Sequence, residues 1–233
     1  MKTTIFLILI LASNYGVSQS ESYFFNKALT EFDSGNYQNA IEYFSKAIEI
    51  NSMNDKAFLG RAKSKKLIGD FLEAIQDFST SINLNSSNPE AYLGRGICYH
   101  FMGWDNRAVN DFTNSINLDN SNFLTFYNRG SSKHNLGDYQ GAIVDYTHAI
   151  ALYEFYYIYF ARGNAKALIR DGRGAILDYT KSIELEPNNP NAYYRRGQIK
   201  IIMGQINDGC LDFSKAGELG HPKAYKSIME YCN

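Results

Sequence analysis

Small and aromatic side chains recur along the chain at a fixed interval. The small residues are 34 residues apart, with a single interval of 33, and stand at Ala28, Ala62, Gly96, Gly130, Gly163 and Gly197. Sixteen residues after each of them stands an aromatic residue, at Phe44, Phe78, Phe112, Tyr146, Tyr179 and Phe213. A regular period of this length predicts a stack of repeated structural elements.

Each interval predicts a pair of helices joined by a tight turn. In the segment 69–85, GDFLEAIQDFSTSINLN, apolar residues follow one another at the spacing of a helix face rather than of a strand. Glycine stands at the predicted turns, where a left-handed backbone ends a helix, at positions Gly35, Gly69, Gly103, Gly137 and Gly204. The pairs Asn88-Pro89 and Asn189-Pro190 predict helix starts, because asparagine caps a helix and proline suits its first position.

The alternation of small and aromatic residues has a packing reason. Two helices of a hairpin lie about 8–10 Å apart, and the distance depends on side-chain size at the contact. Alanine or glycine lets the backbones approach, and the aromatic ring fills the space between them. A single helix pair cannot bury its apolar face alone, so we expect neighbouring pairs to stack.

The repeated pattern resembles the tetratricopeptide repeat, most visibly in LGDYQGAIVDYTHAIAL (136–152) and NAYYRRGQIK (191–200). The resemblance covers six repeats within 21–223, at 21–54, 55–88, 89–122, 123–155, 156–189 and 190–223, followed by a predicted capping helix at 224–233. It implies an all-α, right-handed α-solenoid whose first helices line a concave groove. It also implies a scaffold for protein interaction, without catalysis of its own.

The predicted groove presents apolar residues at equivalent places of the six repeats: Phe25, Leu59, Leu93, Tyr127, Phe160 and Tyr194. Asn128, Tyr157 and Asn164 accompany them. This set favours a peptide or protein segment with aromatic and aliphatic anchors. Two alternatives stay open: a glycan or small ligand that stacks on the aromatic rings, and self-association, in which another copy of the chain fills the groove.

The junction between the fourth and fifth repeats departs from the others. Residues 153–160, YEFYYIYF, replace a polar turn with aromatic residues, and one residue of the period is missing. Tight packing across a shortened turn would explain the run, because aromatic stripes at helical spacing are usually core. The alternative is an exposed aromatic patch that anchors a partner. The next turn also departs, with Arg170 in the place of glycine and Gly172 in the place of an aromatic residue.

The N-terminus reads as a signal peptide over residues 1–18. A positive start precedes the apolar run IFLILILA (5–12), and small residues follow near a cleavage site at Ser18. We therefore expect an exported protein, periplasmic or extracellular. The apolar run is too short for a stable membrane span, and no integral membrane segment is expected after cleavage.

Charged residues repeat with the helices. Arginine precedes the small residue in five repeats and aspartate follows sixteen residues later, which predicts the pairs Arg61–Asp77, Arg95–Asp111, Arg129–Asp145, Arg162–Asp178 and Arg196–Asp212. If exposed, each pair would stabilise the fold by about 0–1 kcal/mol. Cys210 and Cys232 could form a disulfide in an oxidising compartment.

The composition and the absence of known motifs exclude some classes of function. The net charge of −1 gives no basic patch for a nucleic acid, and 45% hydrophobic residues suffice for a folded core. The sequence contains no phosphate-binding loop, nucleophile elbow or zinc-protease motif. We therefore expect no enzymatic activity, no cofactor and no metal site.

Overall fold

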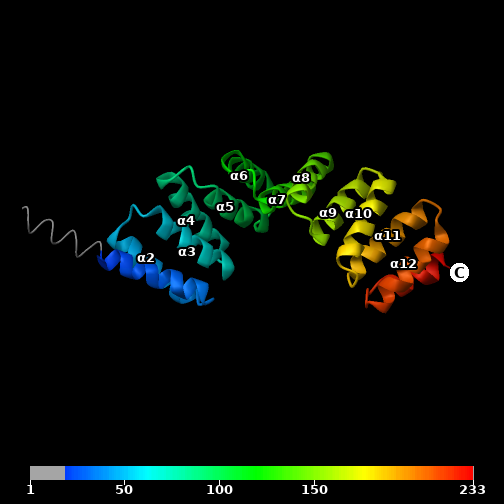
Figure 1. The fold of residues 1–233 in the computed structure, drawn as a ribbon, viewed down its shortest axis with the longest axis horizontal. Helices are drawn as coiled ribbons and strands as arrows, with labels where there is room; N and C mark the ends of the chain where they lie inside the picture. The colour runs from blue at the N-terminus through cyan, green and yellow to red at the C-terminus, as the bar shows by residue number, and fades with distance from the viewer. Residues whose placement is uncertain (1–18, 233) are drawn as a thin grey trace, which may run out of the picture. The chain divides into compact units, whose positions relative to one another are not determined.

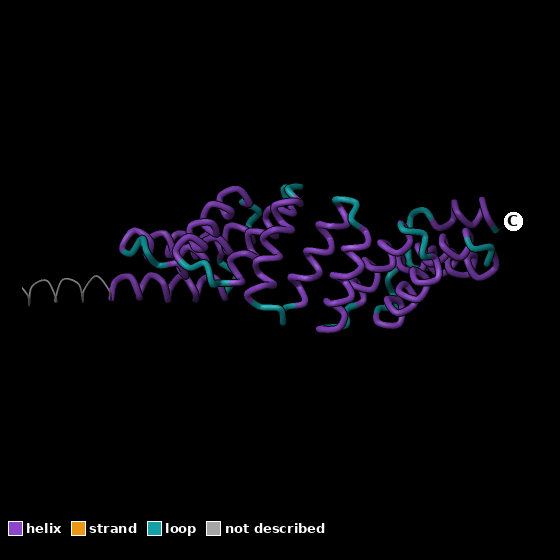
Figure 2. The backbone as a smooth tube through the Cα atoms, turned by 90° about the horizontal axis from the view of Figure 1, so that it is seen from above, coloured by secondary structure: helices purple, strands orange, loops and turns teal. Residues whose placement is uncertain are grey.

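The computed structural model describes residues 19–232, and every regular element in that range is a helix (Figures 1 and 2). The predicted signal peptide lies outside the described residues. The first helix is described over residues 19–33. The others are α2 (Tyr37–Ile50), α3 (Asp55–Leu67), α4 (Phe71–Leu84), α5 (Pro89–Phe101), α6 (Asp105–Leu118), α7 (Phe123–Asn135), α8 (Tyr139–Leu152), α9 (Tyr156–Leu168), α10 (Gly172–Leu185), α11 (Pro190–Ile202), α12 (Ile206–Glu218) and α13 (Ala224–Tyr231).

The helices pack as hairpins, and neighbouring hairpins stack through α2 and α3, α4 and α5, α8 and α9, and α10 and α11. Helix α3 packs on α4 and α5 on α6, and the pairs α7–α8, α9–α10 and α11–α12 repeat the arrangement. The chain divides after Leu118 into two compact halves. We call residues 19–118 the N-terminal half and residues 119–232 the C-terminal half. The predicted fold class, an all-α solenoid of helix-turn-helix repeats, is confirmed.

The core consists of the contacts between small and aromatic residues that the period predicts. The rings of Phe44, Phe78 and Phe112 are buried in the N-terminal half, as are Tyr146, Tyr179 and Phe213 in the C-terminal half. A Cβ atom added to Gly130 would lie 2.8 Å from Cε1 of Tyr146, and one added to Gly163 would lie 2.9 Å from Cε1 of Tyr179. The small residues therefore provide the space that the rings occupy.

The helix ends also follow the sequence signals. The five predicted turn glycines all have positive φ, between 73° and 90°. The side chains of Asn54, Asn88, Asn122 and Asn189 accept backbone N–H groups at the starts of α3, α5, α7 and α11. Arg170, in place of glycine, adopts φ 64°, a conformation that is costly for a residue with a side chain.

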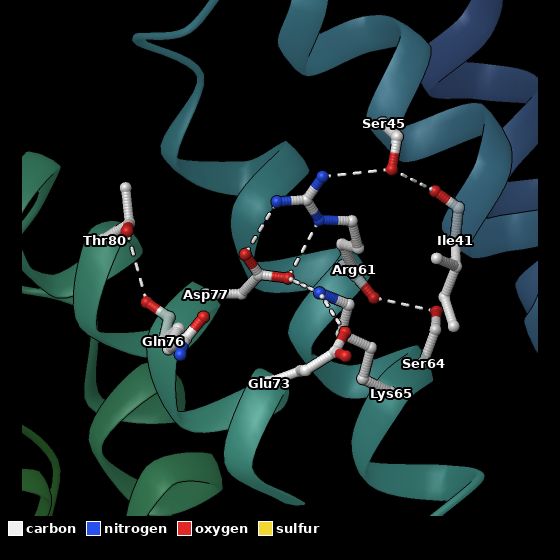
Figure 3. Close-up of polar contacts among 10 residues, drawn as sticks. Ile41, Ser45, Arg61, Ser64, Lys65, Glu73, Gln76, Asp77 and Thr80 are labelled. Atoms are coloured by element: carbon white, nitrogen blue, oxygen red, sulfur yellow. Dashed lines mark hydrogen bonds and ion pairs between the residues drawn. The ribbon is translucent and has the colours of Figure 1, made fainter. Parts of the chain in front are cut away.

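The five predicted arginine–aspartate pairs all form, each within its own repeat. Figure 3 shows the first: Arg61 Nε donates to Oδ2 of Asp77 at 2.8 Å and Nη2 donates to Oδ1 at 2.7 Å. Arg61 Nη1 also donates to Oγ of Ser45 in the preceding repeat, at 3.0 Å. The aspartate side chains are buried, so the condition of exposure behind the estimate of about 0–1 kcal/mol does not hold for these pairs.

A lysine that the sequence analysis overlooked completes four of these pairs. It stands four residues after the arginine, and in Figure 3 Lys65 Nζ lies 2.9 Å from Oδ2 of Asp77. Lys133, Lys166 and Lys200 repeat the contact in later repeats. The spacing of four residues, which places two side chains on one helix face, is the signal that could have identified them.

The C-terminal end is closed by α13, which lies within the segment 224–233 predicted to form a cap. Helix α13 packs on α12, and Cys210 of α12 forms a disulfide with Cys232. Cys98 is a buried free cysteine. None of the described helices is long and apolar enough to cross a membrane.

Candidate functional site

A pocket lies at the end of the C-terminal half, where α9, α11 and the turn before α13 meet. Its volume is about 400 Å³. We call this pocket the C-terminal pocket. It is lined by Phe160 and Asn164 from α9, by Asn191, Tyr194, Arg195 and Gln198 from α11, and by His221, Pro222 and Lys223 from the turn. Three of the predicted groove residues, Phe160, Asn164 and Tyr194, therefore line one pocket.

The first helices bring these residues together because they stack side by side. Helix α9 contacts both α7 and α11. Phe160 and Tyr194 stand at equivalent places of successive first helices, and each ring packs against the aromatic residue of its own second helix. The ring centroids are 5.7 Å apart for Phe160 and Tyr179, and 5.4 Å for Tyr194 and Phe213.

Tyr194 lines the C-terminal pocket, but its side chain is buried and is not available as an anchor for a partner. Only 8% of the residue is exposed, because the ring of His221 stacks on it with centroids 3.9 Å apart. The hydroxyl of Tyr194 lies 3.2 Å from Oγ of Ser227 in α13. Tyr194 therefore holds the cap in place and presents little surface to a partner.

A hydrogen bond from Tyr179 orients the side chain of Asn164. The Tyr179 hydroxyl donates to its Oδ1 at 2.8 Å, and burial raises the pKa of Tyr179, so the hydroxyl keeps the proton that it donates. Asn164 Nδ2 makes no hydrogen bond to any residue between 19 and 232. It remains as a donor for an acceptor on a ligand.

The pocket is cationic. Arg195 Nη1 donates to Oε1 of Gln198 at 3.3 Å, and within the described part of the chain neither Arg195 nor Lys223 forms an ion pair. Burial lowers the pKa of His221, and the charges of Lys223 and Arg195 lower it further. The pocket thus offers two cations and an amide donor beside an aromatic ring, which suits a carboxylate next to an apolar group.

The remaining predicted groove residues of the C-terminal half make contacts with the protein itself. Tyr127 packs edge-on against Tyr157 at 5.0 Å and lies 5.9 Å from Tyr146. Asn128 Nδ2 donates to the carbonyl oxygen of Leu124 in its own helix at 2.7 Å. These side chains are half-buried and do not line the C-terminal pocket.

The aromatic run at 153–160 is partly packed and partly exposed. The rings of Phe123, Tyr153 and Phe155 form a cluster with centroids 4.3–5.4 Å apart. Phe155 occupies the cap position of α9 without a side-chain hydrogen bond, so ring packing replaces the asparagine caps of the other junctions. Tyr153 is nevertheless 53% exposed and Tyr156 36%. Each of the two explanations of the run thus accounts for part of it.

The groove residues predicted in the N-terminal half lie in or on its core. Leu59 is 9% exposed, and Phe25 packs against Phe44 with ring centroids 5.7 Å apart. Leu93 is half-buried. Beside them Lys63 forms an ion pair with Glu90 at 2.6 Å, which satisfies both charges.

The repeat places Gln198 beside the predicted Phe160, Asn164 and Tyr194, but sequence reasoning missed the other five lining residues of the C-terminal pocket: Asn191, Arg195, His221, Pro222 and Lys223. The last three belong to the turn before α13, whose position relative to α9 depends on the fold. The segment HPK at 221–223, polar and basic directly after the last repeat, is the signal that could have drawn attention to it.

Comparisons with protein-family models support the predicted repeats. Tetratricopeptide repeat models match residues 22–54, 125–156 and 178–210. The third match starts in α10 and ends in α12, so it joins the second helix of one repeat to the first helix of the next. A comparison with curated proteins gives no match.

Solved structures share the fold. A crystal structure of MamA is 27% identical, with a TM-score of 0.67, covering 70% of this chain and 96% of MamA. YrrB, described as a tetratricopeptide repeat protein with an unusual peptide-binding site, is 21% identical, with a TM-score of 0.72 and coverage of 80% and 97%. PilF of Pseudomonas aeruginosa is 13% identical, with a TM-score of 0.76 and coverage of 92% and 99%. The chain therefore contains tetratricopeptide repeats in the three matched segments and shares the fold of these solved structures.

Proposed function

We propose that this protein is a non-catalytic scaffold that binds a peptide or protein segment through the C-terminal pocket. The observation that carries the proposal is the two cations Arg195 and Lys223, which form no ion pair with any residue between 19 and 232 and lie beside the Asn164 amide and the Phe160 ring. A carboxylate of the segment would accept from the cations and the amide, and an apolar neighbour would pack on the ring.

The proposal includes export. The predicted signal peptide would direct the chain to the periplasm or the cell exterior, where its partner would be another exported protein. An oxidising compartment also suits the Cys210–Cys232 disulfide, which holds the cap that supplies His221 and Lys223 to the pocket.

A crosslinking pull-down from the envelope fraction and the culture medium tests the proposal. The bait variants are Arg195→Glu, in the pocket, and Lys226→Glu, an exposed residue of α13 outside the pocket lining that changes net charge equally. Wild type and Lys226→Glu are expected to recover the same protein, and Arg195→Glu to recover at least about tenfold less, since truncating a charged contact costs over about 1.4 kcal/mol.

Other results would contradict the proposal. Equal recovery by both variants would move binding to a different face. Recovery of the bait alone, with a mass that rises with concentration, would favour self-association. A bound glycan, without any protein partner, would favour a ligand receptor.

A further inference from the structure

The fifth repeat lacks the two side chains that meet at the turn between the helices in the first and fourth repeats. A residue near the end of the first helix pairs there with the first residue of the second helix. Phe32 and Tyr37 form such a pair with ring centroids 5.5 Å apart, and His134 and Tyr139 form another at 5.2 Å. In the fifth repeat the two equivalent residues are Ala167 and Gly172.

The missing side chains leave a hollow of about 700 Å³, which we call the turn hollow. Its apolar lining consists of Ala167, Gly172, Ile199, Ile202 and Met203. Ile202 is 79% exposed. An aliphatic cavity of only about 150 Å³ binds benzene, so the turn hollow has room for an aromatic side chain and its neighbours.

An equivalent contact elsewhere in the chain shows how a ring would be seated. Phe71 of the second repeat stacks on Phe101 of the third, with ring centroids 5.2 Å apart and planes 2° from parallel. Gly172 is the equivalent of Phe71, and Ile202 is the equivalent of Phe101. A ring supplied by a partner would therefore cover Ile202 as Phe71 covers Phe101.

The polar lining of the turn hollow favours an anionic partner. Arg170 and Arg173 are exposed, and among residues 19–232 their guanidinium groups form no ion pair. The one carboxylate in the lining belongs to Asp171, whose Oδ1 accepts a hydrogen bond from the Gly174 N–H at 2.9 Å. Asp171 therefore already caps the N-terminus of α10, the positive end of the helix dipole.

The backbone of Arg170 is a second indication of function. Its φ of 64° is left-handed, and the other turns place glycine at this position. Strain of this kind that persists in a structure is a reason to look for a functional role of the side chain. The replacement of glycine by arginine at the rim of the turn hollow places a cation there at a conformational cost.

We propose that the turn hollow binds a partner segment with an aromatic residue flanked by acidic residues. The ring occupies the place of the missing aromatic side chain, over Ile202 and Met203, and the carboxylates lie against Arg170 and Arg173. This site is separate in its residues from the C-terminal pocket and does not depend on it.

A labelled, amidated pentapeptide with a central phenylalanine between aspartate–glutamate pairs tests the proposal by fluorescence anisotropy. Gly172→Tyr introduces the tyrosine that the first and fourth repeats have at this position, Tyr37 and Tyr139, and fills the hollow from within. A Cβ atom at this position lies 2.9 Å from Sδ of Met203, the end of a flexible and exposed side chain that can move. Thermal unfolding checks that the variant folds.

Wild type is expected to bind the peptide, and Gly172→Tyr to bind it about tenfold or more weakly, the equivalent of burying one aromatic side chain. Arg173→Gln, which leaves the hollow open, is expected to weaken binding about twofold to fivefold at low salt. The matched control is Lys181→Gln, in the same helix but outside the turn hollow, where the lysine side chain is 41% exposed; this change leaves affinity unchanged.

Three results would overturn the proposal. In the first, the peptide shows no saturable binding to wild type. In the second, it binds wild type and Gly172→Tyr equally. In the third, wild type binds a peptide with alanine in place of phenylalanine as tightly as the original peptide. Dimerisation of wild type that Gly172→Tyr abolishes, seen by sedimentation velocity, would also overturn it, because a second copy would then cover the hollow.

Discussion

The buried pair Arg129–Asp145 provides the most quantitative prediction. The Asp145 carboxylate is fully buried and accepts from Arg129 Nε at 2.9 Å and from Nη2 at 2.7 Å. Lys133 Nζ lies 2.9 Å from the same carboxylate. Replacing Asp145 by alanine leaves two poorly solvated cations facing each other, and replacing Arg129 leaves the carboxylate with Lys133 as its ion-pair partner.

Removing one partner of a buried ion pair costs about 3–5 kcal/mol. We expect each of Arg129→Ala and Asp145→Ala to fall in that range, which corresponds to a fall in Tm of roughly 6–20 °C for a chain of this size. The double variant removes both charges together. It is expected to lose about 2 kcal/mol less than the sum of the single losses, since contacting charges couple by about 0.5–3 kcal/mol.

The assay is urea unfolding of the four proteins, followed by circular dichroism. The matched control is the exposed pair Lys181–Glu184, with its atoms 3.5 Å apart and side chains 41% and 60% exposed. Its coupling is expected to stay below about 0.5 kcal/mol. Additive losses at Arg129 and Asp145, or equal coupling in both pairs, would refute the inference that burial makes the repeated pairs strong.

Three further predictions concern the turns, the cap and the pocket. Arg170→Gly is expected to raise the free energy of unfolding by about 1 kcal/mol, and Gly137→Arg to lower it by about as much, because the left-handed backbone is costly for a residue with a side chain; opposite signs in urea unfolding would contradict this. Cys232→Ser is expected to lower the free energy of unfolding by about 3 kcal/mol, because it removes the disulfide. Alkylation of unfolded wild type without reduction is expected to label one thiol, that of Cys98. Three labelled thiols would count against the disulfide. Since the folded pKa of His221 lies below its ordinary value of 6.5, the unfolded chain binds its proton more readily, and stability should fall as pH drops below 6.5; His221→Gln should show a weaker fall between pH 7.5 and 5.

The repeats could be predicted from the sequence because their signals are local and recur. The period of small and aromatic residues, the turn glycines and the asparagine caps each describe contacts within one repeat or between neighbours. The arginine–aspartate pairs belong to the same class, since both residues lie in one hairpin. In each case repetition along the chain made the pattern visible.

The C-terminal pocket could be predicted only in part. Phe160 and Asn164 follow from the repeat, but the position of His221 over Tyr194 depends on how the cap packs and has no counterpart in the other repeats. Burial likewise depends on the local environment: Leu59 and Tyr194 stand at equivalent places, yet they are covered by different neighbours. A periodic pattern identifies equivalent positions and does not show which of them remain open.

Site-specific photo-crosslinking in the native host tests the central claim most directly, that a protein segment binds at the C-terminal pocket. A photoreactive phenylalanine analogue is placed at Asn191, an exposed lining residue, and in a second strain at Lys226, exposed on α13 outside the lining. The account predicts an adduct with one exported protein from position 191 and none from position 226. An adduct from position 226 alone, or equal adducts from both, would contradict it.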